Sequence, residues 1–202
     1  MVTTNSLCKL LDIRYPLMQA GMAGATTAEL VSAVSNSGGL GILGATRMSP
    51  TELLATLKKI KKNTVKPFGV NLWIGPSITN NKNEEERSVQ QFLNEKIRKP
   101  LDIPLKPEIS SERQDSNKNQ NNSRDLSFES KYNEQIKIIV EEDVPVASFV
   151  MGDPVKYIDK LHSRGIKVIS MVTNVEDAVT LAKNGSDIIM AQGAEAGGQA
   201  AR

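Results

Sequence analysis

Strand-like and helix-like segments alternate along most of this chain, and that alternation limits its fold more than any other feature. Each strand-like segment is a short, mainly apolar run, such as VPVASFV, and the segment after it has apolar residues at helical spacing. Regular alternation of strand and helix predicts an α/β fold with a parallel sheet and helices outside it. The expected strands are residues 16–20, 40–43, 67–73, 144–150, 166–171 and a sixth that begins at Asp187.

Residues that can cap a helix stand before several of the helical segments. A Ser, Thr, Asp or Asn at this position accepts a hydrogen bond from a free N–H of the first turn. Ser49 is followed by Pro50, which suits the first helical position because it has no N–H to satisfy. The expected caps are Thr26 or Thr27, Ser49, Asp153 and Asn174.

A polar stretch interrupts the alternation between the third and fourth expected strands. Its centre, SSERQDSNKNQNNSRD, has too few apolar residues to offset the entropy lost on ordering. We therefore predict one domain over residues 1–202, interrupted by a polar, mobile excursion at about 104–127.

Charge and composition exclude several classes of function. The 25 Lys and Arg residues are nearly balanced by 23 Asp and Glu, so no general basic field favours nucleic acid. Cys8 is the single cysteine and His162 the single histidine, which leaves almost no ligands for a transition metal. His162 stands near the end of a helical segment, where a role at the helix terminus is favoured over catalysis. Without a signal peptide or a membrane-spanning run, the sequence predicts a soluble, cytoplasmic protein with no membrane partner.

Gly39, Gly41 and Gly44 in GLGILG match the spacing of a dinucleotide-binding fingerprint. That motif requires a strand before its first glycine and a helix that opens at its last. Here a helical segment precedes Gly39 and the expected strand lies inside the motif. The context therefore argues against a dinucleotide site of the Rossmann type.

The segment DIIMAQGAEAGGQAAR is the strongest candidate for a ligand site. Its first half is a buried strand, and its second half is a loop of small residues that includes Gly193, Gly197 and Gly198. Glycines let a ligand approach the backbone closely, and such loops at the carboxyl end of a parallel strand commonly bind ligands. The alternative is that these glycines only form a turn.

Two amide side chains are expected at the carboxyl ends of strands. Asn71 lies near the end of the third expected strand and Gln192 at the end of the sixth. With no titratable base beside them, two amides suit the N–H and C=O edge of a heterocycle better than proton transfer. The alternative is that neighbouring loops satisfy both amides structurally.

Six sequence blocks, in this order, resemble the nitronate monooxygenase family, formerly called 2-nitropropane dioxygenases. The resemblance covers nearly the whole chain except the polar excursion. It implies a TIM-type (β/α) barrel that binds FMN and oxidises alkyl nitronates with dioxygen. Flavin-dependent enoyl-acyl-carrier-protein reductase is a related branch. The blocks are YPLMQAGMAG, SNSGGLG, PFGVNLW, VPVASFVMGDP, GIKVISMVTNVEDA and AQGAEAGG.

The resemblance also implies roles for individual residues. Asn71 matches the family's flavin-binding asparagine, and Gln192 matches the glutamine that addresses the flavin. Gly197 matches a glycine whose backbone lies against the cofactor. Met22 resembles a position that packs near the isoalloxazine ring.

Gln199 departs from the family pattern, in which a histidine serves as active-site base or substrate contact. An amide has no useful basicity near neutral pH, so a neutral nitroalkane would not lose its proton. A preformed nitronate is already an anion and could be polarised by the Gln199 N–H group. The sequence therefore predicts weak activity that is confined to nitronates.

A second departure is length. Arg202 follows the sixth expected strand, whereas a complete barrel has eight strands, and the last two units usually carry the phosphate-binding loops. We therefore predict an incomplete barrel, about six of eight βα units, that is poorly loaded with FMN. The alternatives are a non-catalytic remnant and a relative of the enoyl reductase branch. The physiological substrate and the oligomeric state do not follow from the sequence.

Overall fold

The computed structural model describes residues 5–74, 88–89, 91–105 and 130–197. The chain divides into two compact units, Met1–Pro76 with Ser130–Arg202, and Ser77–Glu129. The described part of the second unit contains a short π-helix, η1 (Asn94–Arg98). The predicted excursion at 104–127 falls almost entirely outside the described residues, so its boundaries and the single-domain interpretation stay predictions. Among the described helices, none is long and apolar enough to cross a bilayer.

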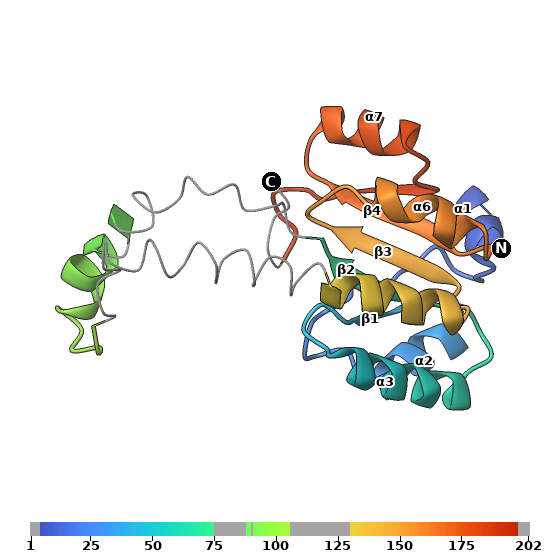
Figure 1. Cartoon of the computed structure of the whole chain (residues 1–202), viewed down its shortest axis with the longest axis horizontal. Helices are drawn as coiled ribbons and strands as arrows, with labels where there is room; N and C mark the ends of the chain where they lie inside the picture. Colours follow the sequence, from blue (N-terminus) through green and yellow to red (C-terminus); the bar gives the residue numbers. More distant parts are fainter. Residues whose placement is uncertain (1–4, 75–87, 90, 106–129, 198–202) are drawn as a thin grey trace. The chain divides into compact units, whose positions relative to one another are not determined.

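The first unit contains a five-stranded sheet in which every pair of neighbouring strands is parallel. The strands follow one another across the sheet in chain order, as in a (β/α) barrel, whereas a doubly wound sheet reverses its order. The predicted α/β class with barrel-type winding is therefore confirmed, and the open sheet forms part of such a barrel (Figure 1). The strands are β1 (Gly41–Gly44), β2 (Phe68–Trp73), β3 (Val146–Val150), β4 (Lys167–Val172) and β5 (Ile188–Ala191).

The expected strand at 16–20 is wrong as a full strand, because it is reduced to one parallel bridge between Met18 and Leu40. The Leu40 N–H donates to Leu17 O, and the Gln19 N–H donates to Leu40 O, each at 2.9 Å. Beyond this bridge, the backbone groups of Ile42 bond to the Gln19 side chain and not to another backbone segment. Its Nε2 donates to Ile42 O at 3.2 Å, and its Oε1 accepts from the Ile42 N–H at 3.4 Å.

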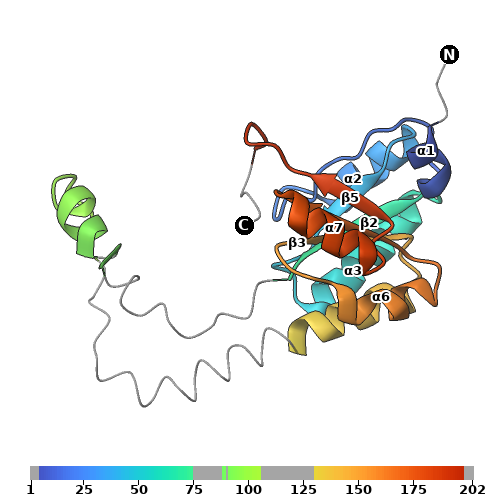
Figure 2. The same cartoon turned by 90° about the horizontal axis from the view of Figure 1, so that it is seen from above.

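Helices lie around the strands in both views (Figure 1, Figure 2). Thr27, Ser49 and Asn174 cap their helices as predicted, and Ser49 forms a full capping box with Glu52. The prediction of Asp153 as the cap is wrong, because the N-cap of the helix is Pro154; Asp153 stands one residue earlier, and its Oδ1 accepts the Val155 N–H at 2.8 Å. The helices are α1 (Ser6–Leu11), α2 (Ala28–Asn36), α3 (Pro50–Asn63), an unlabelled helix over residues 130–141, α6 (Val155–His162) and α7 (Val175–Lys183).

Two apolar clusters cover the two faces of the sheet. Successive strand residues point to opposite faces, so Val70 and Leu72 face the outer helices while Asn71 faces inward. The inner cluster joins residues of α1 and the segment after it to Ile42, Val146 and Ile169. Since Val146 begins β3, this cluster closes the sheet at the amino ends of the strands, where Figure 1 shows α1. On the same inner face, Asn71 and Ser148 follow this cluster toward the carboxyl ends of β2 and β3.

Candidate active site at the carboxyl ends of the strands

One row of residues crosses the inner face of the sheet in register. Each member pairs with the next on the neighbouring strand, and two neighbouring members are polar while the two after them are apolar. Polar side chains on a face that is otherwise apolar require partners or a ligand. The row is Gly44, Asn71, Ser148, Ile169 and Ile188.

The Asn71 side chain is closely approached on two sides, by Ser148 and by Gly21. Its Nδ2 donates to Ser148 O at 3.4 Å and to Ser148 Oγ at 3.2 Å. On the other side lies the backbone of Gly21, where an added Cβ would stand 2.6 Å from Asn71 Cβ. The absence of a side chain at Gly21 is therefore what makes room for the Asn71 amide.

Met22 belongs to a turn that is fixed over the end of β1. The Thr26 hydroxyl donates to Met22 O at 2.9 Å and accepts the Gly44 N–H at 2.8 Å. Gly44 fits closely beneath this turn, because an added Cβ would lie 2.7 Å from Ala23 N. The Met22 side chain is 44% exposed. Met22 and Asn71 therefore lie at the same rim of the sheet.

Gln192 lies at this rim too, because it directly follows β5 and its N–H donates to Val172 O at 2.8 Å. Strands β3 and β4 separate it from Asn71. In the loop beyond, the Glu195 carboxylate lies against Gly193, and among the described residues no atom lies within 4 Å of a Cβ built on Gly197. Gln199, the residue expected to meet the substrate, lies outside the described residues.

The loop after β1 is held by the helix over residues 130–141, which sequence reasoning did not connect to the site. Gln135 is fully buried, and its Nε2 donates to Ala45 O at 3.0 Å and to Met48 O at 2.9 Å. Lys131 Nζ donates to Thr46 O at 3.1 Å. The Ala45 N–H in turn donates to Asn71 O at 3.0 Å, so this helix supports the strand that carries Asn71.

Ser148 was also missed from the sequence. A hydroxyl in the apolar run VPVASFV is the signal that could have pointed to it, by the same argument that singled out Asn71. Ser148 is 3% exposed, so its Oγ is buried beside the candidate site.

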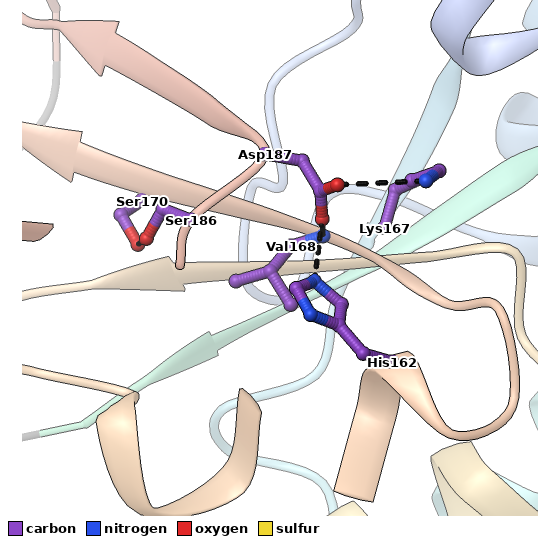
Figure 3. A network of polar contacts seen from close by, with 6 residues as sticks. All are labelled: His162, Lys167, Val168, Ser170, Ser186 and Asp187. Atoms are coloured by element: carbon purple, nitrogen blue, oxygen red, sulfur yellow. Dashed lines mark hydrogen bonds and ion pairs between the residues drawn. The ribbon is translucent and has the colours of Figure 1, made fainter. Parts of the chain in front are cut away.

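His162 lies at the opposite rim, in a network centred on Asp187 (Figure 3). Asp187 Oδ2 contacts His162 Nε2 at 2.8 Å and accepts the Val168 N–H at 2.8 Å, and Lys167 Nζ lies 3.5 Å from Oδ1. Burial alone would raise the pKa of the Asp187 carboxyl, but these three partners together lower it below its ordinary value. Asp187 precedes β5 and Val168 lies near the start of β4, so this network joins elements at the amino ends of the strands.

Comparison with known proteins gives consistent results. A family model described as nitronate monooxygenase matches residues 4–202. A curated relative from Staphylococcus haemolyticus (strain JCSC1435), named "Probable nitronate monooxygenase", is 37% identical over 195 residues, covering 96% of this chain and 50% of the relative. A relative of the same name from Staphylococcus aureus (strain Newman) is 33% identical over 199 residues, covering 98% of this chain and 51% of the relative. The chain thus spans about half the length of the curated relatives it matches.

Solved structures show the same likeness. Nitroalkane oxidase from Streptomyces ansochromogenes superposes with a TM-score of 0.69 at 26% identity, covering 96% of this chain and 50% of that chain. FabK from Thermotoga maritima superposes with a TM-score of 0.66 at 29% identity, covering 97% of this chain and 46% of that chain.

Proposed function

The chain belongs to the nitronate monooxygenase family, and from this premise we propose that its strand rim binds FMN and supports the oxidation of alkyl nitronates by dioxygen. The observation that carries the proposal is the placement of Asn71. Its amide lies on the inner face near the carboxyl end of β2, beside the turn that contains Met22. Ligand sites of parallel α/β barrels form at this end of the strands.

The chemistry of the described residues fits the ring of a flavin. Asn71 and Ser148 provide neutral hydrogen-bonding groups side by side, which suit the polar edge of a heterocycle. Ile169 and Ile188 continue the same row and belong to the apolar packing of the inner cluster, which supports this row from below. We assign Met22, Asn71, Gln192 and Gly197 to the cofactor. FMN, when bound, supplies the redox chemistry between the nitronate and dioxygen.

We assign Gln199 to the substrate. An amide cannot remove the proton of a neutral nitroalkane at neutral pH, but its N–H group can donate to an anionic nitronate. The proposed substrates are therefore preformed nitronates, with dioxygen as the second reactant, and a cytoplasmic location accords with such small-molecule chemistry.

A second candidate function is reduction of an enoyl thioester. The likeness to FabK from Thermotoga maritima favours it, and its TM-score of 0.66 nearly equals that of the nitroalkane oxidase. A non-catalytic protein that retains the family fold is the third alternative. These functions differ in cofactor content and in the co-substrate consumed.

The test is to purify the full chain, add FMN, measure retained flavin by absorbance, and follow oxygen uptake at neutral pH. We expect uptake with propyl-2-nitronate and none with 2-nitropropane, and we expect Gln199→His to gain activity with 2-nitropropane. Equal turnover of both compounds by the unmodified chain would contradict the role of Gln199. Consumption of NAD(P)H with an enoyl thioester would identify the second candidate, and failure to retain any flavin would support the third.

A further inference from the structure

We propose that Ser148 is a positioning residue that fixes the orientation of the Asn71 amide, so that Asn71 Oδ1 accepts a hydrogen bond from a ring N–H of the ligand. The flavin part of this inference rests on the proposed function, whereas the positioning part concerns the protein alone.

The Asn71 atom that faces Ser148 is its amide nitrogen. The carbonyl oxygen of Ser148 can only accept a hydrogen bond, so the Asn71 atom at 3.4 Å from it must be the nitrogen. The same nitrogen lies 3.2 Å from Ser148 Oγ. Both distances exceed the ~2.9 Å of a typical N–H···O bond, so the orientation of the amide depends on the two contacts together. The nitrogen end of the amide is thereby turned toward Ser148.

Asn71 and Ser148 each leave one hydrogen-bonding group for a ligand. With its nitrogen turned toward Ser148, Asn71 presents Oδ1, an acceptor, on the other side of the amide. Ser148 Oγ accepts from Asn71, and no other partner of this oxygen exists among the described residues. The hydroxyl hydrogen is therefore available as a donor. The inner face thus carries an acceptor on β2 and a donor on β3, with Asn71 Nδ2 facing Ser148 Oγ and Oδ1 on the side of Gly21.

A ligand that complements this pair carries both a donor and an acceptor on its ring. An acceptor beside a donor matches a ring in which an N–H stands next to a C=O, as in a lactam or an imide. An oxidised isoalloxazine carries a single ring N–H, which is flanked by two carbonyl groups. The pair therefore suits this edge of the flavin, and a methyl group on that nitrogen would remove the donor that Asn71 Oδ1 requires.

The experiment compares three variants of the full chain. Ser148→Ala removes the hydroxyl, and Ser148→Thr retains it. Ser170→Ala is the matched control, because Ser170 is equally buried on the neighbouring strand but its hydroxyl contacts Ser186 at 2.7 Å and not Asn71. The first readout is the ¹⁵N-detected side-chain NH₂ group of Asn71 without ligand, followed by chemical shift and hydrogen exchange. The second is the affinity for riboflavin and for 3-methylriboflavin, measured by flavin fluorescence.

In the unmodified chain, we expect riboflavin to bind at least about tenfold more tightly than its 3-methyl analogue, because a site built for a donor rejects a ligand that lacks one. Ser148→Ala should lose most of this preference and should shift the Asn71 NH₂ signals and speed their exchange. Ser148→Thr and Ser170→Ala should retain the original pattern on both readouts.

Unchanged Asn71 NH₂ signals in Ser148→Ala would overturn the positioning role, whatever the flavin result. An equal preference for the two flavins in the unmodified chain would overturn the acceptor role of Asn71. If neither flavin binds, the proposed function fails, and the NH₂ signals still decide whether Ser148 orients the amide.

Discussion

Gly21 shows how closely the backbone approaches Asn71. An added Cβ at Gly21 would lie 2.6 Å from Asn71 Cβ and 3.1 Å from its Cγ. Gly21→Ala should therefore displace the Asn71 side chain and destabilise the protein by about 1–3 kcal/mol, as overpacking usually does. Urea denaturation measures the effect, and riboflavin affinity should fall with it.

The control for this substitution is Gly197→Ala. A Cβ at Gly197 would meet no atom of the described part of the chain within 4 Å, and Gly197 is not among the glycines with positive φ. Its unfolding free energy should equal that of the unmodified chain. If Gly21→Ala is as stable as Gly197→Ala, the close approach of Gly21 to Asn71 is wrong.

At the scale of single residues, the sequence predicted the position of Asn71 but not its partners. A polar residue in an apolar run is visible in PFGVNLW, whereas the contact with Ser148 depends on β2 and β3 pairing across the long insertion between them. Gly21 could not be distinguished from the other glycines, because its function follows from which side chain lies beside it.

Among the elements, the helix over residues 130–141 has the largest effect on the site. Gln135 directs its nitrogen at two loop carbonyls, and its Oε1 has no hydrogen-bond partner among the described residues. Gln135→Met should lower the free energy of unfolding by about 1–3 kcal/mol, because Ala45 O and Met48 O lose their donor. The same substitution also removes the unpaired oxygen.

Gln135→Glu tests the same contact with the opposite chemistry. A buried carboxylate would face two carbonyl oxygens and could donate to neither. Gln135→Glu should therefore lower the free energy of unfolding by more than Gln135→Met does, by roughly 3 kcal/mol or above. Denaturant midpoints of the two variants at pH 7 give the comparison. Equal stability of the two variants would show that the Gln135 nitrogen does not hold this loop.

Sequence reasoning predicted the helix starts better than the first strand, for a physical reason. Capping depends on residues three positions apart, so Ser49 with Glu52 and Asn174 with Asp177 could be read directly. The extent of residues 16–20 as a strand depends instead on what Ile42 pairs with, and the Gln19 side chain fills that place. No local pattern contains that information.

On the scale of the whole molecule, the two rims of the sheet have different roles. The carboxyl rim carries the candidate site, while the Asp187 network joins α6, β4 and β5 at the amino rim. Because the folded state lowers the pKa of Asp187, its contribution to stability is present above the unfolded pKa of about 3.9 and is lost as pH falls through the folded pKa.

Asp187→Asn should therefore be less stable than the unmodified chain at pH 7, and the difference should shrink below about pH 4. Denaturation at pH 7, 5 and 3 measures it. Asp159→Asn changes the net charge equally through an exposed carboxylate on α6 and serves as the control. A difference for Asp187→Asn that stays constant from pH 7 to pH 3 would contradict this interpretation.

The parallel winding of the whole sheet was predictable because each strand and helix leaves a periodic pattern in the sequence. The position of Gln199 relative to Asn71 was not, because it depends on a glycine-rich loop whose path no periodicity fixes. Its role therefore rests on the family resemblance and on the activity test.

The chain-order arrangement of the strands has a consequence for synthesis on the ribosome. Ile169 pairs with Ile188 and Gly41 with Phe68, which are close to each other in the sequence. Most strands therefore pair with a strand that leaves the ribosome shortly after them. Gly69, in contrast, must wait for Val146, which is translated after the entire insertion. Closing that longer loop costs little in free energy but delays the contact. During this interval the nascent edge of β2 is open to capture by a chaperone or by another polypeptide.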